Sequence, residues 1–117
     1  MPRLRSKYGA IKTTVDGIVF DSKKEAVRYC ELKRLMGMGK IRKLELQPKF
    51  DLVVNGVKVC YYRADFSYDE LDEEHVKKGG SKYWNPVIED VKGMKTSIYR
   101  LKAKLMKACL GITVKET

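Results

Sequence analysis

Apolar residues recur at helical spacing in two segments, which predicts two amphipathic helices. The first begins at Ser22, where Ser22-Lys23-Lys24-Glu25 fits a capping box, and ends at two closely spaced glycines, 37 and 39. The second begins at a Thr96 cap and ends at Gly111. We expect its inner face to carry four apolar residues, namely Ile98, Leu101, Leu105 and Cys109.

Alternating and β-branched segments between the helices predict strands. Asp16-Gly17 and Asn55-Gly56 are two-residue turns that predict hairpins. The expected strands lie at 41–46, 50–54, 57–68, 86–92 and 112–114, after an N-terminal β-hairpin at 13–20, and the acidic, glycine-rich segment 69–82 is expected to be a mobile loop. This order predicts an α/β (α+β) fold around one mixed central sheet.

Size and charge restrict the class of protein. A chain of 117 residues predicts one domain, here 13–117, preceded by a basic arm at 1–12. The net charge of +10 favours nucleic acid as the partner over a membrane surface. No apolar run approaches the ~20 residues of a membrane span, and we expect a cytoplasmic protein. With one histidine and three scattered cysteines, we expect buried thiols rather than a zinc site.

A small set of acids stands out within this basic chain. Asp65 lies in one predicted strand, and Asp90-Val91-Lys92 lies in a later one. If the two strands are neighbours, both carboxylates can face one site, and Lys92 emerges on the same side of the pleat as Asp90. Magnesium is usually held by one or two carboxylates plus phosphate and water, and a nearby ammonium stabilises charge on the phosphate. The pattern predicts metal-assisted phosphodiester hydrolysis with Mg²⁺, for which Mn²⁺ can substitute.

Each of these residues also has a purely structural interpretation. Glu25 can simply close the capping box, and Asp65 can pair with Arg63 at the surface. An Asp-x-Lys triplet such as 90–92 is common by chance. The combination of the residues on adjacent strands carries the functional interpretation, and the alternatives stay open at this stage.

The motifs together resemble the PD-(D/E)XK nuclease superfamily, in particular a group of small phage-encoded endonucleases. They are also similar to the catalytic domain of the endonuclease subunit of heteromeric transposases. The resemblance covers about residues 7 to 112 and rests on the segments 20–25, 46–48, 62–66 and 89–93. It implies a restriction-endonuclease-like αβββαβ core, with Glu25, Asp65 and Asp90 as metal ligands and Lys92 as the catalytic lysine.

The chain departs from the superfamily pattern at two positions. Ala64 stands where proline is usual, and the last motif carries Asp90 rather than glutamate. The adjacent Glu89 leaves open which of the two acids faces the site.

The second predicted helix carries basic residues that suit phosphate contacts, together with the lysine that precedes it: Lys95, Arg100, Lys104 and Lys107. The alternative is an ordinary solvated helix face. Without a recognition-helix pattern, we expect cutting that is selective for DNA structure rather than for sequence.

Three functions are compatible with these observations. The first is a Mg²⁺-dependent DNA endonuclease acting on branched, nicked or four-way (Holliday) junction DNA in phage recombination or DNA processing, with a homodimer needed to cut a junction symmetrically. The second is a non-enzymatic basic nucleic-acid-binding module. The third is a transposase-type endonuclease subunit that is active only with a partner. Cleavage by the purified chain, and its loss on removing Asp65 or Asp90, separates them.

Overall fold

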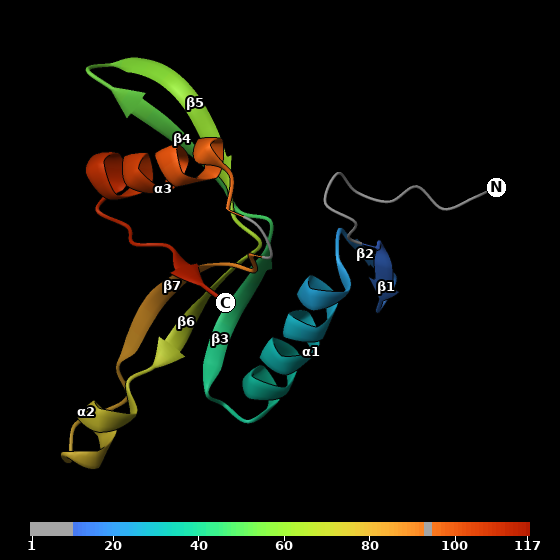
Figure 1. The fold of residues 1–117 in the computed structure, drawn as a ribbon. Coiled ribbons are helices and arrows are strands. Elements are labelled where there is room, and N and C mark those ends of the chain that lie inside the picture. The colour runs from blue at the N-terminus through green and yellow to red at the C-terminus, as the bar shows by residue number, and fades with distance from the viewer. Residues whose placement is uncertain (1–10, 93–94) are drawn as a thin grey trace.

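The computed structural model describes residues 11–92 and 95–117, so most of the predicted basic arm lies outside the described residues. The chain forms a mixed α+β fold, as predicted (Figure 1). Its elements are β1 (Thr13–Val15), β2 (Ile18–Phe20), α1 (Lys23–Gly37), β3 (Ile41–Leu46), β4 (Lys49–Val54), β5 (Val57–Arg63), β6 (Phe66–Leu71), α2 (Glu73–Lys77), β7 (Trp84–Asp90), α3 (Ser97–Leu110) and β8 (Lys115–Glu116).

The central sheet has the strand order β3-β6-β7-β8. The β3–β6 and β6–β7 pairs are antiparallel, and β8 runs parallel to β7. With the hairpins and the short helix α2 set aside, the chain order is α1-β3-β6-β7-α3-β8, which agrees with the predicted αβββαβ order, and the predicted N-terminal β-hairpin is confirmed. The last strand lies at 115–116, just after the predicted 112–114. None of the described helices is long and apolar enough to cross a bilayer.

The predicted single strand over 57–68 is wrong, because the chain bends between β5 and β6. Strands β3 and β4 run alongside β6 and β5 as one long antiparallel ribbon. At the bend, Gln47 has a positive φ of 51° and Pro48 has no N–H to donate. Two backbone bonds keep the ribbon paired through the bend, one from Gln47 N to Asp65 O and one from Ala64 N to Pro48 O. Asp65 therefore lies at a kink rather than in the middle of a strand.

The prediction of a loop over 69–82 is wrong for 69–77, whereas 78–82 contain no helix or strand. Strand β6 continues to Leu71, and the acidic segment forms the short helix α2. The carboxylate of Asp72 caps this helix by accepting a hydrogen bond from the backbone N–H of His75 (3.0 Å). The acidic end of the molecule, at α2, lies at the opposite end of β6 and β7 from the Asp65 kink (Figure 1).

Two apolar clusters form the core, one around α1 and the central sheet and the other between α3 and the β4–β5 hairpin. Helix α1 lies along β3 and contributes Ala26, Tyr29 and Leu32 to the first cluster. Helix α3 lies alongside the β4–β5 hairpin (Figure 1). Its Tyr99 and Met106 pack there against Leu52 and Tyr62.

The predicted inner face of α3 is wrong for Ile98 and Leu101, which are largely exposed, whereas the predicted Leu105 and Cys109 do pack against this cluster. The expectation of buried thiols is wrong for Cys30, which is exposed. Cys60 and Cys109 are partly buried and pack against the cluster between α3 and the hairpin. Ile98 and Leu101 are exposed because α3 packs against the hairpin with the side that carries Tyr99 and Met106.

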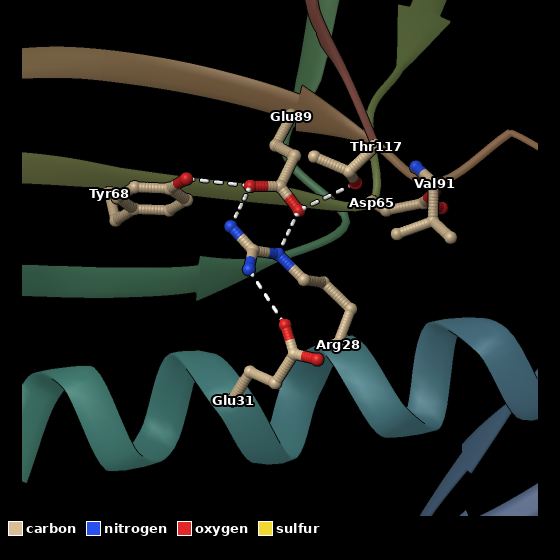
Figure 2. A network of polar contacts seen from close by, with 7 residues as sticks. All are labelled: Arg28, Glu31, Asp65, Tyr68, Glu89, Val91 and Thr117. Atoms are coloured by element: carbon tan, nitrogen blue, oxygen red, sulfur yellow. Dashed lines mark hydrogen bonds and ion pairs between the residues drawn. The ribbon is translucent and has the colours of Figure 1, made fainter.

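A buried ion pair joins α1 to β7 (Figure 2). The carboxylate of Glu89 is fully buried and accepts two hydrogen bonds from Arg28, at 2.7 Å (Nε) and 2.9 Å (Nη2). The hydroxyls of Tyr68 (2.6 Å) and Thr117 (3.0 Å) donate to the same carboxylate. Burial alone would raise the pKa of Glu89, but the bonds from Arg28 and Tyr68 outweigh it and lower that pKa. This pair fixes the distance between the helix and the sheet.

Replacing Arg28 by alanine is predicted to destabilise the fold by about 3–5 kcal/mol, because it leaves the Glu89 charge buried without its partner. Chemical denaturation followed by circular dichroism measures this. The double variant Arg28→Ala/Glu89→Gln should lose less, because it removes the uncompensated charge. Lys58→Ala serves as the control, since its exposed pair with Asp51 is worth less than about 1 kcal/mol. Equal losses for Arg28→Ala and Lys58→Ala would contradict this account of the anchor.

Candidate active site

The kink between β5 and β6 positions Asp65. Its carboxylate Oδ2 accepts a hydrogen bond of 2.8 Å from the backbone N–H of Val91, the residue between Asp90 and Lys92 (Figure 2). Its own N–H donates to the carbonyl of Glu89 at 3.2 Å. Asp65 immediately precedes Phe66 and Asp90 immediately follows Glu89, and Phe66–Glu89 is the last pair of the antiparallel β6–β7 ladder, so both acids lie at the same end of the sheet. The kink thus brings Asp65 to the end of β7.

Asp90 points to the opposite face of β7 from Glu89, because side chains alternate along a strand. Its side chain is only 1% exposed, and Oδ1 lies 3.6 Å from the ammonium of Lys92. Oδ2 is buried and has no hydrogen-bond partner among residues 11–92 and 95–117. Burial raises the pKa of Asp90 to about 6, and the Lys92 ammonium limits the rise. A buried carboxylate oxygen without a donor is costly, and a cation is one way to satisfy it.

Lys92 is held by contacts on several sides. Its ammonium lies 4.2 Å from the centre of the Tyr99 ring, in addition to its contact with Asp90. Its backbone N–H donates to the carbonyl of Thr117, and its carbonyl accepts from the ammonium of Lys24 (3.1 Å). The ammonium therefore stands beside the Asp90 carboxylate with a defined direction.

Glu25 is placed to act either as a helix cap or as a metal ligand, the two roles that the sequence left open. Its N–H donates to Ser22 Oγ (3.1 Å), while its Oε2 accepts from the N–H of Asp21 (3.1 Å), one residue earlier than in the standard capping box. The same carboxyl adjoins Asp65, and burial together with that neighbour raises the pKa of Glu25 to about 8. Glu25, Gln47 and Asp65 line a cavity of about 270 Å³ between the N-terminal hairpin and the ends of β3 and β6.

The described residues contain no group of three or more His, Cys, Asp or Glu side chains arranged as a ready-made metal site. Magnesium does not require one, because it is commonly bound through one or two carboxylates while water and phosphate complete its coordination. The unpartnered Oδ2 of buried Asp90 and the adjacent Asp65 match that requirement. Asp65 and Asp90 are therefore the candidate ligands of a divalent cation, and Glu25 adjoins Asp65 from the α1 side.

The predicted nucleic-acid-binding residues separate into two kinds. Lys95 forms an ion pair with Glu116 at 3.1 Å, so part of its charge is compensated. Arg100, Lys104 and Lys107 are exposed on α3 and, within residues 11–92 and 95–117, form no ion pair.

Sequence reasoning missed the residues that support the site. Arg28 follows Glu25 by three positions on the same helix face, a spacing that could have revealed it. Tyr99 both packs against Lys92 and donates to Glu116 at 2.9 Å. Burial and the bond to Glu116 raise the pKa of this tyrosine. Glu116 reaches the site only because β8 pairs with β7, and no sequence pattern indicates that pairing.

Comparison with known proteins gives one match. A family model described as "Protein of unknown function (DUF1064)" matches residues 5–112. A search of curated proteins and a search of solved structures each gave no match. Because the matched segment spans most of the 117 residues, this chain belongs to the DUF1064 family.

Proposed function

We propose that this protein is a metal-dependent DNA endonuclease that hydrolyses phosphodiester bonds. The observation that carries the proposal is the buried carboxylate of Asp90, which has one oxygen facing Lys92 and the other without a donor among the described residues. Asp65 lies beside it, tied to the N–H of Val91. Acids gathered in this way oppose phosphate binding in a chain of net charge +10, unless a cation stands between them and the phosphate.

In this proposal Asp65 and Asp90 hold Mg²⁺, or Mn²⁺ in its place, with Glu25 as a third ligand. When bound there, a divalent cation would supply Lewis-acid polarisation of the phosphate and activation of water. Lys92 stabilises the negative charge that develops on the phosphate, because its ammonium is held between Asp90 and the Tyr99 ring. Arg100, Lys104 and Lys107 bind the DNA backbone without reading its sequence, and Lys95 assists from the start of α3.

We also propose a substrate class and a biological setting for this activity. The proposed contacts are to the DNA backbone, which carries no sequence information. We therefore propose that the enzyme selects DNA by its structure, such as branched, nicked or junction DNA, rather than by a defined sequence. A four-way junction needs two symmetrical cuts, so that version of the activity requires a homodimer. We place the activity in phage DNA recombination or processing, in the cytoplasm of an infected or prophage-bearing bacterial cell.

Purified protein with Mg²⁺ or Mn²⁺ is expected to cut DNA, and Asp65→Asn and Asp90→Asn are expected to abolish cutting while retaining DNA binding. Lys92→Met should slow cutting by about 100- to 1000-fold, because it removes one charge-stabilising donor. Labelled four-way junction, nicked and plain duplex substrates measured side by side should show the plain duplex cut most slowly.

The matched control for these variants is Glu45→Gln, which neutralises an exposed acid of β3. It should cut as fast as the wild type. Equal cutting by the wild type and both aspartate variants would identify a contaminant. Binding without cutting in either metal would contradict the proposal and favour a non-enzymatic binding module.

Divalent metal is expected to raise the melting temperature of the wild type in the absence of DNA, because an ion bound only by the folded state stabilises that state. A hundredfold excess of Mn²⁺ over its Kd corresponds to roughly 10 °C for a domain of this size. Asp90→Asn should lose this increment, measured by differential scanning fluorimetry against the same variant in EDTA, whereas Glu45→Gln should keep it. An unchanged increment in Asp90→Asn would remove Asp90 as a ligand.

The variant Glu25→Gln tests whether Glu25 is a metal ligand or only a helix cap. The amide oxygen can still accept the N–H of Asp21, and the raised pKa of Glu25 means that the fold disfavours its charge, so stability in EDTA should not fall. Cutting should fall at least about tenfold, since a metal ligand is lost. Ser22→Ala is the converse variant, expected to lose about 1 kcal/mol of stability with little change in the cutting rate. Full activity of Glu25→Gln would leave Glu25 as a cap alone.

A further inference from the structure

Three cations surround one exposed tyrosine at the base of the β4–β5 hairpin. The ring of Tyr61 on β5 is approached by Lys49 Nζ at 4.7 Å, Lys102 Nζ at 5.2 Å and Arg63 Cζ at 5.9 Å from its centre. The cations come from β4, α3 and β5, so packing of α3 against the hairpin assembles the group. We call Lys49, Tyr61, Arg63 and Lys102 the Tyr61 cluster.

The cluster holds positive charge that the fold does not neutralise. Lys49 and Arg63 stand directly opposite each other in the β4–β5 ladder, an arrangement of like charges that destabilises a sheet. None of the three cations pairs with a carboxylate of residues 11–92 or 95–117, and the remaining residues contain no acid. The acid opposite Tyr61, Asp51, is already paired with Lys58 at 3.2 Å. The ring faces attract these cations but carry no net charge to cancel theirs.

The cluster lies next to the candidate active site. Arg63 ends β5 and precedes Asp65 by two residues, so two residues of chain, at most about 7 Å, separate them across the kink. A nucleic-acid strand carries one phosphate per about 3.4 Å of helix axis. The cluster is therefore within a few phosphates' reach of a strand whose phosphodiester lies at Asp65 and Asp90.

We propose that Lys49, Arg63 and Lys102, gathered around Tyr61, bind the backbone phosphates that flank the bond to be cut. This inference rests on the proposed function for the identity of the ligand. It adds the β4–β5 hairpin to the DNA-binding surface, which the basic residues of α3 alone had defined. Nucleic acid is favoured over an acidic lipid surface because the cluster adjoins the carboxylates of the candidate active site. A substrate strand must reach these carboxylates to be cut, whereas an anionic lipid surface gains nothing from lying against them.

The test measures binding of a labelled four-way junction and a plain duplex by fluorescence anisotropy, in EDTA so that no cutting occurs. The triple variant Lys49→Gln/Arg63→Gln/Lys102→Gln should bind at least about tenfold more weakly at 0.1 M salt. The slope of log K against log salt should become shallower by about 2 to 3, as expected for three lost phosphate contacts. The control Lys33→Gln/Lys77→Gln/Lys82→Gln removes the same charge from exposed positions on α1, on α2 and before β7.

The charge-preserving variant Lys49→Arg/Arg63→Lys/Lys102→Arg should bind nearly as the wild type, which excludes misfolding as the cause of the loss. If the test and control triple variants lose the same DNA affinity, the loss depends only on net charge, and the proposal is overturned. Unchanged affinity in the test triple would overturn it as well, as would binding to phosphatidylserine vesicles without binding to DNA. If binding depends on the cluster but no metal supports cutting, the nuclease activity fails and the phosphate contact stands.

Discussion

The buried pair between Arg28 and Glu89 is the interaction on which the rest of the structure depends. It joins α1 to β7 with two hydrogen bonds, and hydroxyls from β6 and from Thr117 complete the shell around the carboxylate. Three residues before Arg28 stands Glu25, and one residue after Glu89 stands Asp90. Because strand side chains alternate, fixing Glu89 toward α1 directs Asp90 toward the opposite face, where Lys92 and Tyr99 lie. The pair that stabilises the fold thus also sets the geometry of the candidate site.

Local sequence signals predicted the elements well where the cause of the structure is local. The Asp16-Gly17 and Asn55-Gly56 turns, the Ser22 and Thr96 caps and the Gly111 stop all appear as expected. Predictions failed where distant segments decide the outcome. The bend at Asp65 depends on Gln47 and Pro48 in the neighbouring strand, and the buried face of α3 depends on the hairpin that it packs against.

The same division applies to the candidate site. The spacing of Asp90 and Lys92 predicted correctly that their side chains lie on the same side, although β7 ends at Asp90 and Lys92 lies just beyond it. The sequence could not decide between Asp90 and Glu89, because both are acidic neighbours and only the partner on α1 distinguishes them. Nor could it reveal Glu116 or Thr117, which reach the site through the parallel pairing of β8 with β7. Chemical roles for these residues remain proposals, whereas their placement is a property of the fold.

The central claim is that Asp65 and Asp90 share one divalent cation. The most direct measurement is anomalous X-ray scattering from crystals of the wild-type protein grown with Mn²⁺. The account predicts an anomalous peak within coordinating distance of both carboxylates and on the Lys92 side of the sheet, absent from crystals of Asp90→Asn. Crystals saturated with Mn²⁺ that show no peak between Asp65 and Asp90, or a peak only at the acidic α2 end of the molecule, would contradict it.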